Sequence, residues 1–382
     1  MRMRGAMKLS ARAADLAPRL LDNAAQVDCD GRFPTQEFAW LQQQGLLNSG
    51  VVQLPAAEIL EILWHVGRGN LAVGRLYEGH INALQLISWF GDQKQRERLF
   101  ADADDGNLFA VWNTQAGDGV VLNQSENGWQ MSGAKTFCSG AGHVTRPIVT
   151  GSLNSSGWQM VCLPVEEAVL EIDSSWWQPM GMRASASFKT NFSGSFVSSN
   201  DFIGKSDDYY SQPAFSGGAI RFCAVQLGGA AAIFDETRRF LREVGRAEDP
   251  FQESRIGQMA MRIQSGRQWL KNAAEMWESL GESPLKVGDT TAKRMVAFAA
   301  MMRIATEEIC EAVMQFAERS VGARGLMRTE PFERMIRDLT MYLKQPHLDE
   351  IPGRVGKFTL ESELESYSLW QSTETEILNA TE

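Results

Sequence analysis

The spacing of apolar residues divides the chain into three zones. Between residues 11 and about 100, apolar positions recur three and four apart, as in AEILEILWHVGRGNL, which predicts helices separated by glycines. Between about 108 and 208 the apolar period becomes two and turn residues are dense. After about 215, long segments again have helical spacing. This order predicts a mainly α chain with a central β domain.

The middle zone contains a strong hairpin signal. The segment GVVLNQSENGWQMSGAKTF has two alternating stretches joined by Asn127–Gly128, a dipeptide that favours the tight turn of a two-residue hairpin. Further short alternating stretches follow it. The block therefore predicts a small sheet or barrel.

The last zone contains three long amphipathic segments with short links, a pattern typical of an antiparallel bundle. We place the N-cap of the third helix at Asp289 or Thr290, and a shorter helix at 331–342. The predicted domains are an N-terminal helical domain (1–107), a middle small β-barrel or sheet (108–208) and a C-terminal antiparallel four-helix bundle with an acidic tail (209–382).

Composition narrows the class of protein. A net charge of -10 without a basic run argues against a nucleic-acid partner. The most apolar stretch, 219–234, is interrupted by Arg221 and Gln226, so no membrane span is expected. Five scattered cysteines without a CxxC pair predict a reduced, cytoplasmic protein, and four histidines without ligand spacing predict no metal. No GxGxxG after a strand and no GxSxG occurs, which excludes the usual dinucleotide and hydrolase motifs.

Four segments, taken in order, resemble the acyl-CoA dehydrogenase superfamily over nearly the whole chain. They are FAVWNT, NGWQMSGAKTFCSGAGHV, QPMGMRASASFKTNF and ERSVGARGLMRTEPFERMIRDL. The resemblance implies FAD as cofactor, a small-molecule substrate such as an acyl-CoA, and a homodimer or homotetramer, because the cofactor site of that family borrows residues across a subunit interface.

The resemblance also implies which residues lie beside the flavin ring. Matched position by position, they are Trp112, Asn113, Thr114, Phe137, Cys138 and Ser139. Backbone and hydroxyl donors there would stabilise charge on the reduced ring, and an aromatic side chain would pack against it. The alternative is that Trp112 and Phe137 are core residues of the sheet.

A second matched group lies in the helical part and would contact the dinucleotide of a partner subunit. It comprises Arg246, Phe251, Arg319, Gly322, Ala323 and Gly325. Small residues let backbone amides approach a pyrophosphate, and arginine supplies charge. Here Arg319 replaces the family's glutamine and Ala323 replaces a glycine. Helix capping by the glycines and ordinary surface arginines are the alternatives.

The catalytic base of the family is missing from both of its usual places. Counting from Arg337–Asp338, the position of the family glutamate is Pro346, and the position used by other members is Ile220. Desaturation of a thioester requires a group that removes the α proton. Glu78 and His80 are weak candidates for it, and a solvated carboxylate or a structural histidine is the alternative; His347, Asp349 and Glu350 follow Pro346.

The sequence leaves three functions open. The first is an FAD-dependent oxidoreductase of acyl-CoA dehydrogenase type, acting on the CH–CH bond of an acyl thioester with a non-standard or absent base. The second is a flavin monooxygenase on the same fold, as in the dibenzothiophene monooxygenases, which need no such base. The third is a non-catalytic homologue that keeps the fold as a flavin-binding or assembly partner.

Overall fold

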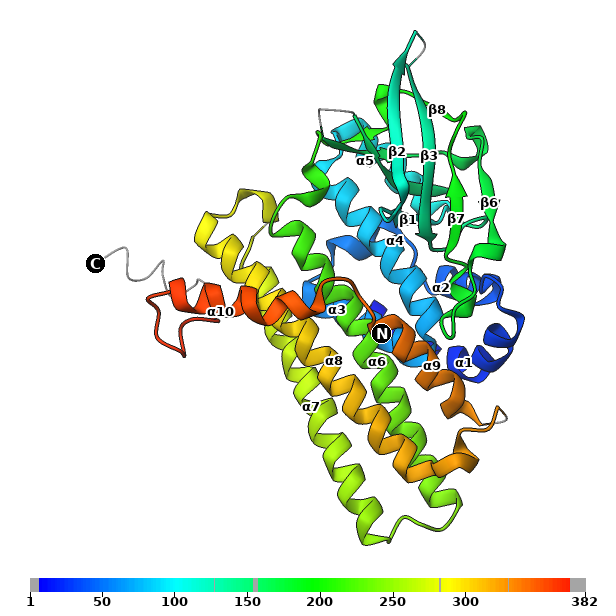
Figure 1. Cartoon of the computed structure of the whole chain (residues 1–382), viewed down its shortest axis with the longest axis vertical. Helices are drawn as coiled ribbons and strands as arrows, with labels where there is room; N and C mark the ends of the chain where they lie inside the picture. The colour runs from blue at the N-terminus through cyan, green and yellow to red at the C-terminus, as the bar shows by residue number, and fades with distance from the viewer. Residues whose placement is uncertain (1–6, 127, 154–156, 282, 329, 372–382) are drawn as a thin grey trace, which may run out of the picture.

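The computed structural model describes residues 7–126, 128–153, 157–281, 283–328 and 330–371. Helices occupy both ends of the chain and a sheet lies between them, which confirms the predicted fold class (Figure 1). The proposed domain limits at 107/108 and 208/209 fall in the segments that precede the first strand and the first bundle helix. That division stays a prediction.

The N-terminal part consists of α1 (Leu9–Asp30), α2 (Thr35–Gln43), α3 (Ala56–Gly69), α4 (Leu71–Phe90) and α5 (Gln93–Asp104). The chain turns between α3 and α4 at Asn70, whose side chain accepts from the backbone N–H groups of Ala72 (2.9 Å) and Val73 (3.2 Å) and so caps α4. Helix α3 crosses α6 (Ala214–Glu243) at Gly67, where a Cβ would lie 2.3 Å from the Val225 carbonyl oxygen. Only glycine permits this approach, which joins the N-terminal helices to the bundle.

The sheet consists of β1 (Phe109–Trp112), β2 (Gln115–Ser125), β3 (Gly128–Cys138), β4 (Arg146–Ser152), β5 (Trp158–Cys162), β6 (Glu171–Asp173), β7 (Phe188–Asn191), β8 (Phe196–Val197) and β9 (Phe202–Ile203). The main order is β6-β7-β3-β2-β4-β5-β9, with β1 on β4 and β8 on β3. The predicted hairpin is confirmed by the antiparallel pairing of β2 and β3, in which Ser125 faces Gly128. Its turn residue Asn127 lies outside the described residues.

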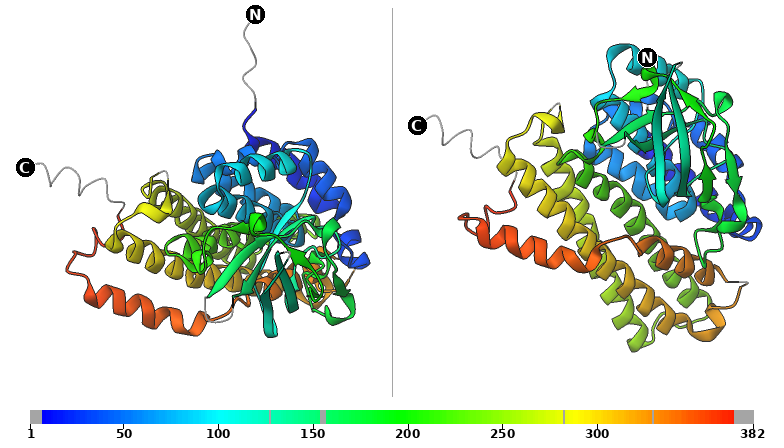
Figure 2. Two further views of the ribbon diagram at one scale, coloured as in Figure 1. Left: turned by 90° about the horizontal axis from the view of Figure 1, so that it is seen from above. Right: turned by 45° about the horizontal axis from the view of Figure 1, so that its top comes forward.

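The C-terminal part is built on α6, α7 (Pro250–Glu278), α8 (Asp289–Gly325), α9 (Pro331–Leu343) and α10 (Ile351–Glu361). The three long helices run side by side and α10 lies across them (Figure 2). Among the described residues, α6 alone has the length and apolar composition of a membrane span, but 83% of its most apolar window is buried inside the protein. It therefore serves as the central helix of the bundle.

The start of α8 differs from the prediction. Its N-cap is Gly288, with no side-chain cap, rather than Asp289 or Thr290. Asp289 lies in the first turn and forms an exposed ion pair with Lys293 at 2.7 Å. An acidic group in the first turn favours the positive end of the helix dipole, which gives Asp289 a stabilising role without capping.

The segment before β7 fastens the sheet to the helices. A Cβ at Gly181 would lie 2.1 Å from the Arg337 carbonyl oxygen, and Met182 N–H donates to Asp338 Oδ1 at 2.6 Å. Arg337 also pairs with Asp28 of α1 at 2.7 Å. Two of the segments used for the family resemblance thus meet in space, on α9.

Candidate functional site

The ends of β1 and β3 bring the first predicted group together. Trp112 Nε1 donates to the Ser139 carbonyl at 3.0 Å, and Thr136 N–H donates to the Thr114 carbonyl at 3.0 Å. The six positions matched to the flavin ring therefore form one continuous edge of the sheet. Their side chains, however, are not all exposed to solvent at that edge.

Phe137 is the aromatic side chain of this edge that can face a ligand. Its side chain is 44% exposed, whereas Trp112 is 1% exposed and packs against Phe192 inside the sheet. Phe137 also has φ 53°, a left-handed conformation that costs a bulky residue of order 1–3 kcal/mol. Trp176 and Trp177 support its ring edge-on, with centroids 5.0 and 5.9 Å away. The arrangement fits a planar ring stacked on Phe137, while Trp112 is a core residue.

Two of the remaining positions in this edge, Asn113 and Ser139, are part of hydrogen-bond networks. Asn113 Oδ1 accepts from Thr150 Oγ1 (2.7 Å) and from the Tyr210 hydroxyl (3.1 Å). Ser139 is buried, and its hydroxyl is 2.9 Å from that of Ser187, which in turn is 2.7 Å from the Ser185 hydroxyl. Such networks fix the backbone at the edge of the sheet.

Thr114 and Cys138 differ in their exposure. Thr114 is exposed, and its hydroxyl has no partner among the described residues. Cys138 is fully buried, and burial raises the pKa of its thiol to about 12. Thr114 can therefore donate to a ligand at this edge, whereas Cys138 stays a neutral thiol inside the sheet.

Glu78 lies in a buried polar cluster between α4 and α6. Its carboxylate accepts from Arg221 Nε at 3.2 Å and from Arg75 Nη1 at 3.1 Å. Arg221 is also bound by Gln85 Oε1 (2.5 Å) and Asn82 Oδ1 (2.6 Å). Both oxygens of Glu78 are thus held by arginines, so taking up a proton would break an ion pair.

His80 is enclosed in the core and both of its ring nitrogens are engaged. Nε2 lies 2.8 Å from the Leu47 carbonyl, and Nδ1 accepts from Phe109 N–H at 3.1 Å. Burial lowers the pKa of His80 to about 4, so the ring is neutral at pH 7. These contacts are those of a structural histidine that joins α4 to β1.

The two places of the family base contain no carboxylate. Ile220 is 3% exposed in α6. The Pro346 carbonyl accepts from Arg303 Nη2 at 2.8 Å. Beside it, His347 pairs with Glu350 at 3.1 Å on the surface, with both side chains about two-thirds exposed. A proton acceptor is therefore absent from both expected positions.

The second predicted group gathers where the last turns of α8 meet the start of α7. Arg255 Nη1 donates to the Arg319 carbonyl at 3.2 Å, and Arg246 pairs with Asp249 at 2.8 Å. Phe251 is 76% exposed beside them. Gly322 has φ 64° and ψ -170° and breaks the helix just before Ala323 and Gly325. In Figure 1 this end of the bundle lies at the bottom, far from the lower ends of β1 and β3.

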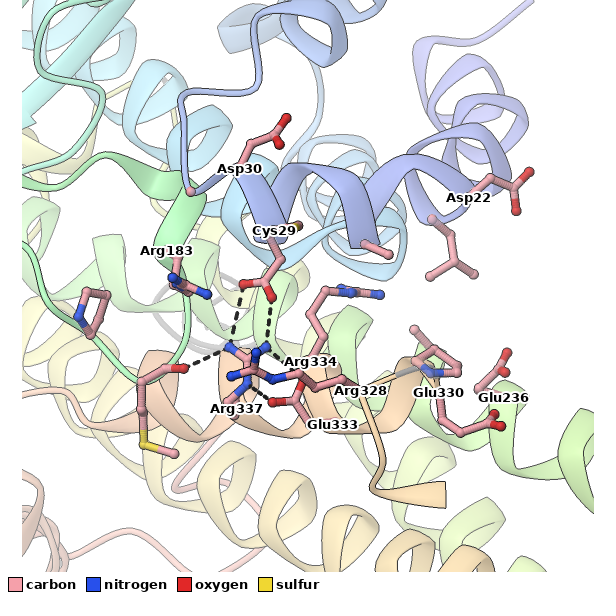
Figure 3. Close-up of a pocket in the computed structure, with 18 of the residues that line it drawn as sticks. Asp22, Cys29, Asp30, Arg183, Glu236, Arg328, Glu330, Glu333, Arg334 and Arg337 are labelled. Carbon is pink, nitrogen blue, oxygen red and sulfur yellow. Dashed lines mark hydrogen bonds and ion pairs between the residues drawn. The ribbon is translucent and has the colours of Figure 1, made fainter. Parts of the chain in front are cut away.

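A large cavity lies on another side of the protein, between α1, α6, α9 and residues 177–183. Its volume is about 1390 Å³ (Figure 3). Arg337 on its wall pairs with Asp28 and Glu333, at 2.7 and 2.6 Å. None of the residues matched to the flavin lines it, although Trp177 on its wall touches the Phe137 ring. The cavity thus adjoins the Trp177 ring, which packs against Phe137.

Comparisons with known proteins agree with this geometry. Residues 209–343 match the family model described as acyl-CoA dehydrogenase, C-terminal domain. This match confirms the predicted resemblance to the acyl-CoA dehydrogenase superfamily. It is 22% identical to the dibenzothiophene monooxygenase of Mycolicibacterium goodii, over 91% of this chain and 92% of that protein. It is 21% identical to the mitochondrial short-chain specific acyl-CoA dehydrogenase of Bos taurus, over 82% and 80%.

A solved structure has the same fold over nearly the full length of this chain. FMN-bound TdsC from Paenibacillus sp. A11-2 superposes with a TM-score of 0.83 at 18% identity, covering 96% of this chain and 100% of that one. The superfamily consists of flavin-dependent oxidoreductases, so the predicted class of cofactor is confirmed at that level. FAD, the oligomer and the cytoplasmic location stay predictions.

Sequence reasoning missed most of the polar cluster around Glu78, although a signal was present. Arg75, Glu78, Asn82 and Gln85 are spaced three, four and three apart in a largely apolar helix. That spacing places them on one face of α4. Their partner Arg221 follows Ile220 in a helix whose burial a single sequence does not show.

Proposed function

We propose that this protein is a flavin-dependent monooxygenase of the acyl-CoA dehydrogenase superfamily that acts on a small molecule. Two observations together support the proposal. Phe137 and Thr114 are exposed at an edge of the sheet that suits a flavin ring, and Ile220 and Pro346 occupy the two positions where the family has its catalytic base. Removal of an α proton needs a positioned acceptor. Reduced flavin, when bound, would supply the transfer of an oxygen atom from O2 to the substrate. That reaction does not need a group that removes an α proton.

The comparisons favour this function over the dehydrogenase predicted first. The chain matches dibenzothiophene monooxygenase over nine-tenths of both proteins, and TdsC with FMN has its fold. Glu78 does not replace the missing base, because Arg75 and Arg221 hold its two oxygens. The side chains of this site then bind and orient the ring, and no residue has to carry a proton from carbon.

We further propose FMN rather than FAD as the flavin. The segment that would approach a second phosphate and an adenosine departs from the family pattern at Arg319 and Ala323. Arg246 and Arg255 still supply positive charge at that end of the bundle, which suits a single phosphate. Because this end lies far from the lower end of β3 in the same chain (Figure 1), we propose that two chains complete each site in a homodimer or homotetramer.

Two measurements on the purified full-length chain test the proposal. Fluorescence titration is expected to show tighter binding of FMN than of FAD. Anaerobic mixing of the flavin-loaded protein with butyryl-CoA is expected to leave the oxidised flavin absorbance unchanged. Bleaching by the thioester would instead establish a dehydrogenase with a relocated base, and a protein that binds neither flavin would be a non-catalytic homologue.

A further inference from the structure

Lys135 is a buried lysine on β3 whose partners are all neutral. Its side chain is fully buried, and its Nζ lies 3.2 Å from the Asn113 carbonyl, 2.6 Å from Gln115 Oε1 and 2.9 Å from Thr150 Oγ1. The Trp158 ring centroid is 5.1 Å away. No carboxylate pairs with it in the part of the chain that the structure describes.

The number of acceptors matches an ammonium group. A protonated lysine has three N–H donors and here meets three oxygens, whereas a neutral amine has two donors and a lone pair. Thr150 also donates to Asn113 Oδ1, so Lys135 holds Asn113 directly through the carbonyl and indirectly through the side chain. The lysine therefore acts on the stretch that links β1 to β2.

Two further hydrogen bonds from β3 orient the same stretch. Thr136 N–H donates to the Thr114 carbonyl, and Thr136 Oγ1 donates to the Gln115 carbonyl, each at 3.0 Å. Three successive carbonyls, of residues 113, 114 and 115, thus accept from β3. Because a trans peptide points its C=O and N–H in opposite directions, binding of the Asn113 carbonyl by Lys135 turns the Thr114 N–H away from the ammonium group.

Gly119 provides the space in which Gln115 reaches Lys135. A Cβ at Gly119 would lie 2.0 Å from Gln115 Oε1, and its φ of 79° disfavours other residues. The register of β2 and β3 shifts between Ala116 and Val121, so Gly119 lies in the irregular part of the hairpin. The irregular part of the hairpin at Gly119 therefore allows the hydrogen bond between Gln115 and Lys135.

We propose that Lys135 is a positioning residue whose ammonium group sets the conformation of residues 113–115, and through it the donors that this edge of the sheet presents to flavin. The part of the inference that concerns flavin rests on the proposed function. The part that concerns the backbone does not.

The arrangement depends on pH. Burial lowers the pKa of Lys135 to about 7, and the titratable group that acts on it, Cys138, stays a neutral thiol because burial raises its pKa to about 12. Loss of the proton leaves two donors for three acceptors. Residues 113–115 are therefore expected to loosen as the pH rises through the pKa of Lys135.

Hydrogen exchange of the full-length chain without flavin tests the backbone part. At pH 6, Lys135→Met is expected to speed exchange in the peptide that covers residues 112–118 by about tenfold, the loss of roughly one charged hydrogen bond. Gly119→Ala is expected to act in the same direction by displacing Gln115. Lys189→Met, a half-exposed lysine on β7, serves as control and is expected to leave that peptide unchanged.

The pH profile separates positioning from a general loss of packing. Corrected for intrinsic exchange rates, the ratio of variant to wild type is expected to fall toward one above the midpoint, because wild type then also lacks the ammonium group. Thr150→Val removes one acceptor and is expected to move the midpoint to lower pH. A ratio independent of pH, or equal exchange in wild type and Lys135→Met at pH 6, overturns the proposal.

FMN titration of the same variants tests the flavin part. The dissociation constant of Lys135→Met is expected to exceed that of wild type about tenfold at pH 6 and to approach it at pH 9, with Lys189→Met unchanged. Comparison at each pH cancels the titration of FMN itself. An exchange effect with no change in FMN affinity would refute the flavin role and retain the backbone role, and a wild type that binds no flavin would refute the proposed function alone.

Discussion

Arg221 of α6 and Glu78 of α4 form an ion pair with 3.2 Å between Nε and Oε1, and both side chains are about 95% buried. The pair fixes two helices to each other at the level where α6 carries Ile220 in place of a base. A buried carboxylate can be a proton acceptor or a structural partner. The contacts of Glu78 favour the second role.

Glu78→Gln is therefore expected to lower the free energy of unfolding, and not only the rate of turnover. Breaking a buried pair leaves Arg221 without its counter-charge and costs about 3–5 kcal/mol. Urea unfolding measures the loss, and Glu78→Gln/Arg221→Met is expected to recover part of it. Asp289→Asn, which breaks an exposed pair with Lys293, is the control and is expected to leave the stability nearly unchanged. A Glu78→Gln protein of unchanged stability that has lost all turnover would assign the carboxylate to catalysis.

The aromatic residues of the sheet edge are expected to separate binding from folding. Phe137→Ala removes a half-exposed ring and is expected to weaken FMN binding about tenfold, with a change in unfolding free energy below about 1 kcal/mol. Trp112→Ala empties a core position and is expected to destabilise the protein by about 3–5 kcal/mol. FMN titration and urea unfolding of both variants give the comparison. Equal affinity in Phe137→Ala and wild type would remove Phe137 from the site.

His80 predicts a loss of stability in acid. Its pKa is about 4 in the folded protein against 6.5 for the free side chain, so below pH 6.5 the unfolded chain binds the proton first. Stability from this group is complete above pH 6.5 and falls by about 2 kcal/mol between pH 6.5 and 5. Protonation would also direct Nδ1–H at the Phe109 N–H, two donors facing each other.

His80→Gln removes the titrating group while keeping an amide donor near Leu47. Urea unfolding at several pH values is expected to show a shallower decline in acid for this variant than for wild type. Parallel declines in the two proteins would mean that other groups control acid unfolding.

Mixing of subunits tests the shared site. Phe137→Ala and Arg255→Ala impair opposite halves of the proposed site, so each homodimer has two impaired sites. In a mixed dimer one site has both halves intact, and random mixing of equal amounts is expected to restore about a quarter of the wild-type FMN capacity. Capacity measured after unfolding and refolding the two chains together, against each refolded alone, decides the point. No gain on mixing would place each site within one chain.

Elements with a clear apolar period could be predicted from sequence, and contacts between them could not. The hairpin of β2 and β3 and the limits of α9 follow from local pattern. The exposure of Phe137 and the burial of Trp112 do not, because alternation along a strand does not reveal which face a partner element covers. The role of His80 depends on the Leu47 carbonyl and the Phe109 amide, which only the tertiary fold brings to it.

Isotope labelling tests the central claim most directly. The protein loaded with reduced FMN is mixed with dibenzothiophene and other small sulfur and nitrogen compounds under ¹⁸O₂, and the products are analysed by mass spectrometry. The account predicts a product that contains one ¹⁸O atom from the gas and that forms only when protein, reduced FMN and oxygen are all present. Products without the label, together with reduction of the oxidised flavin by an acyl-CoA in the absence of oxygen, would contradict it.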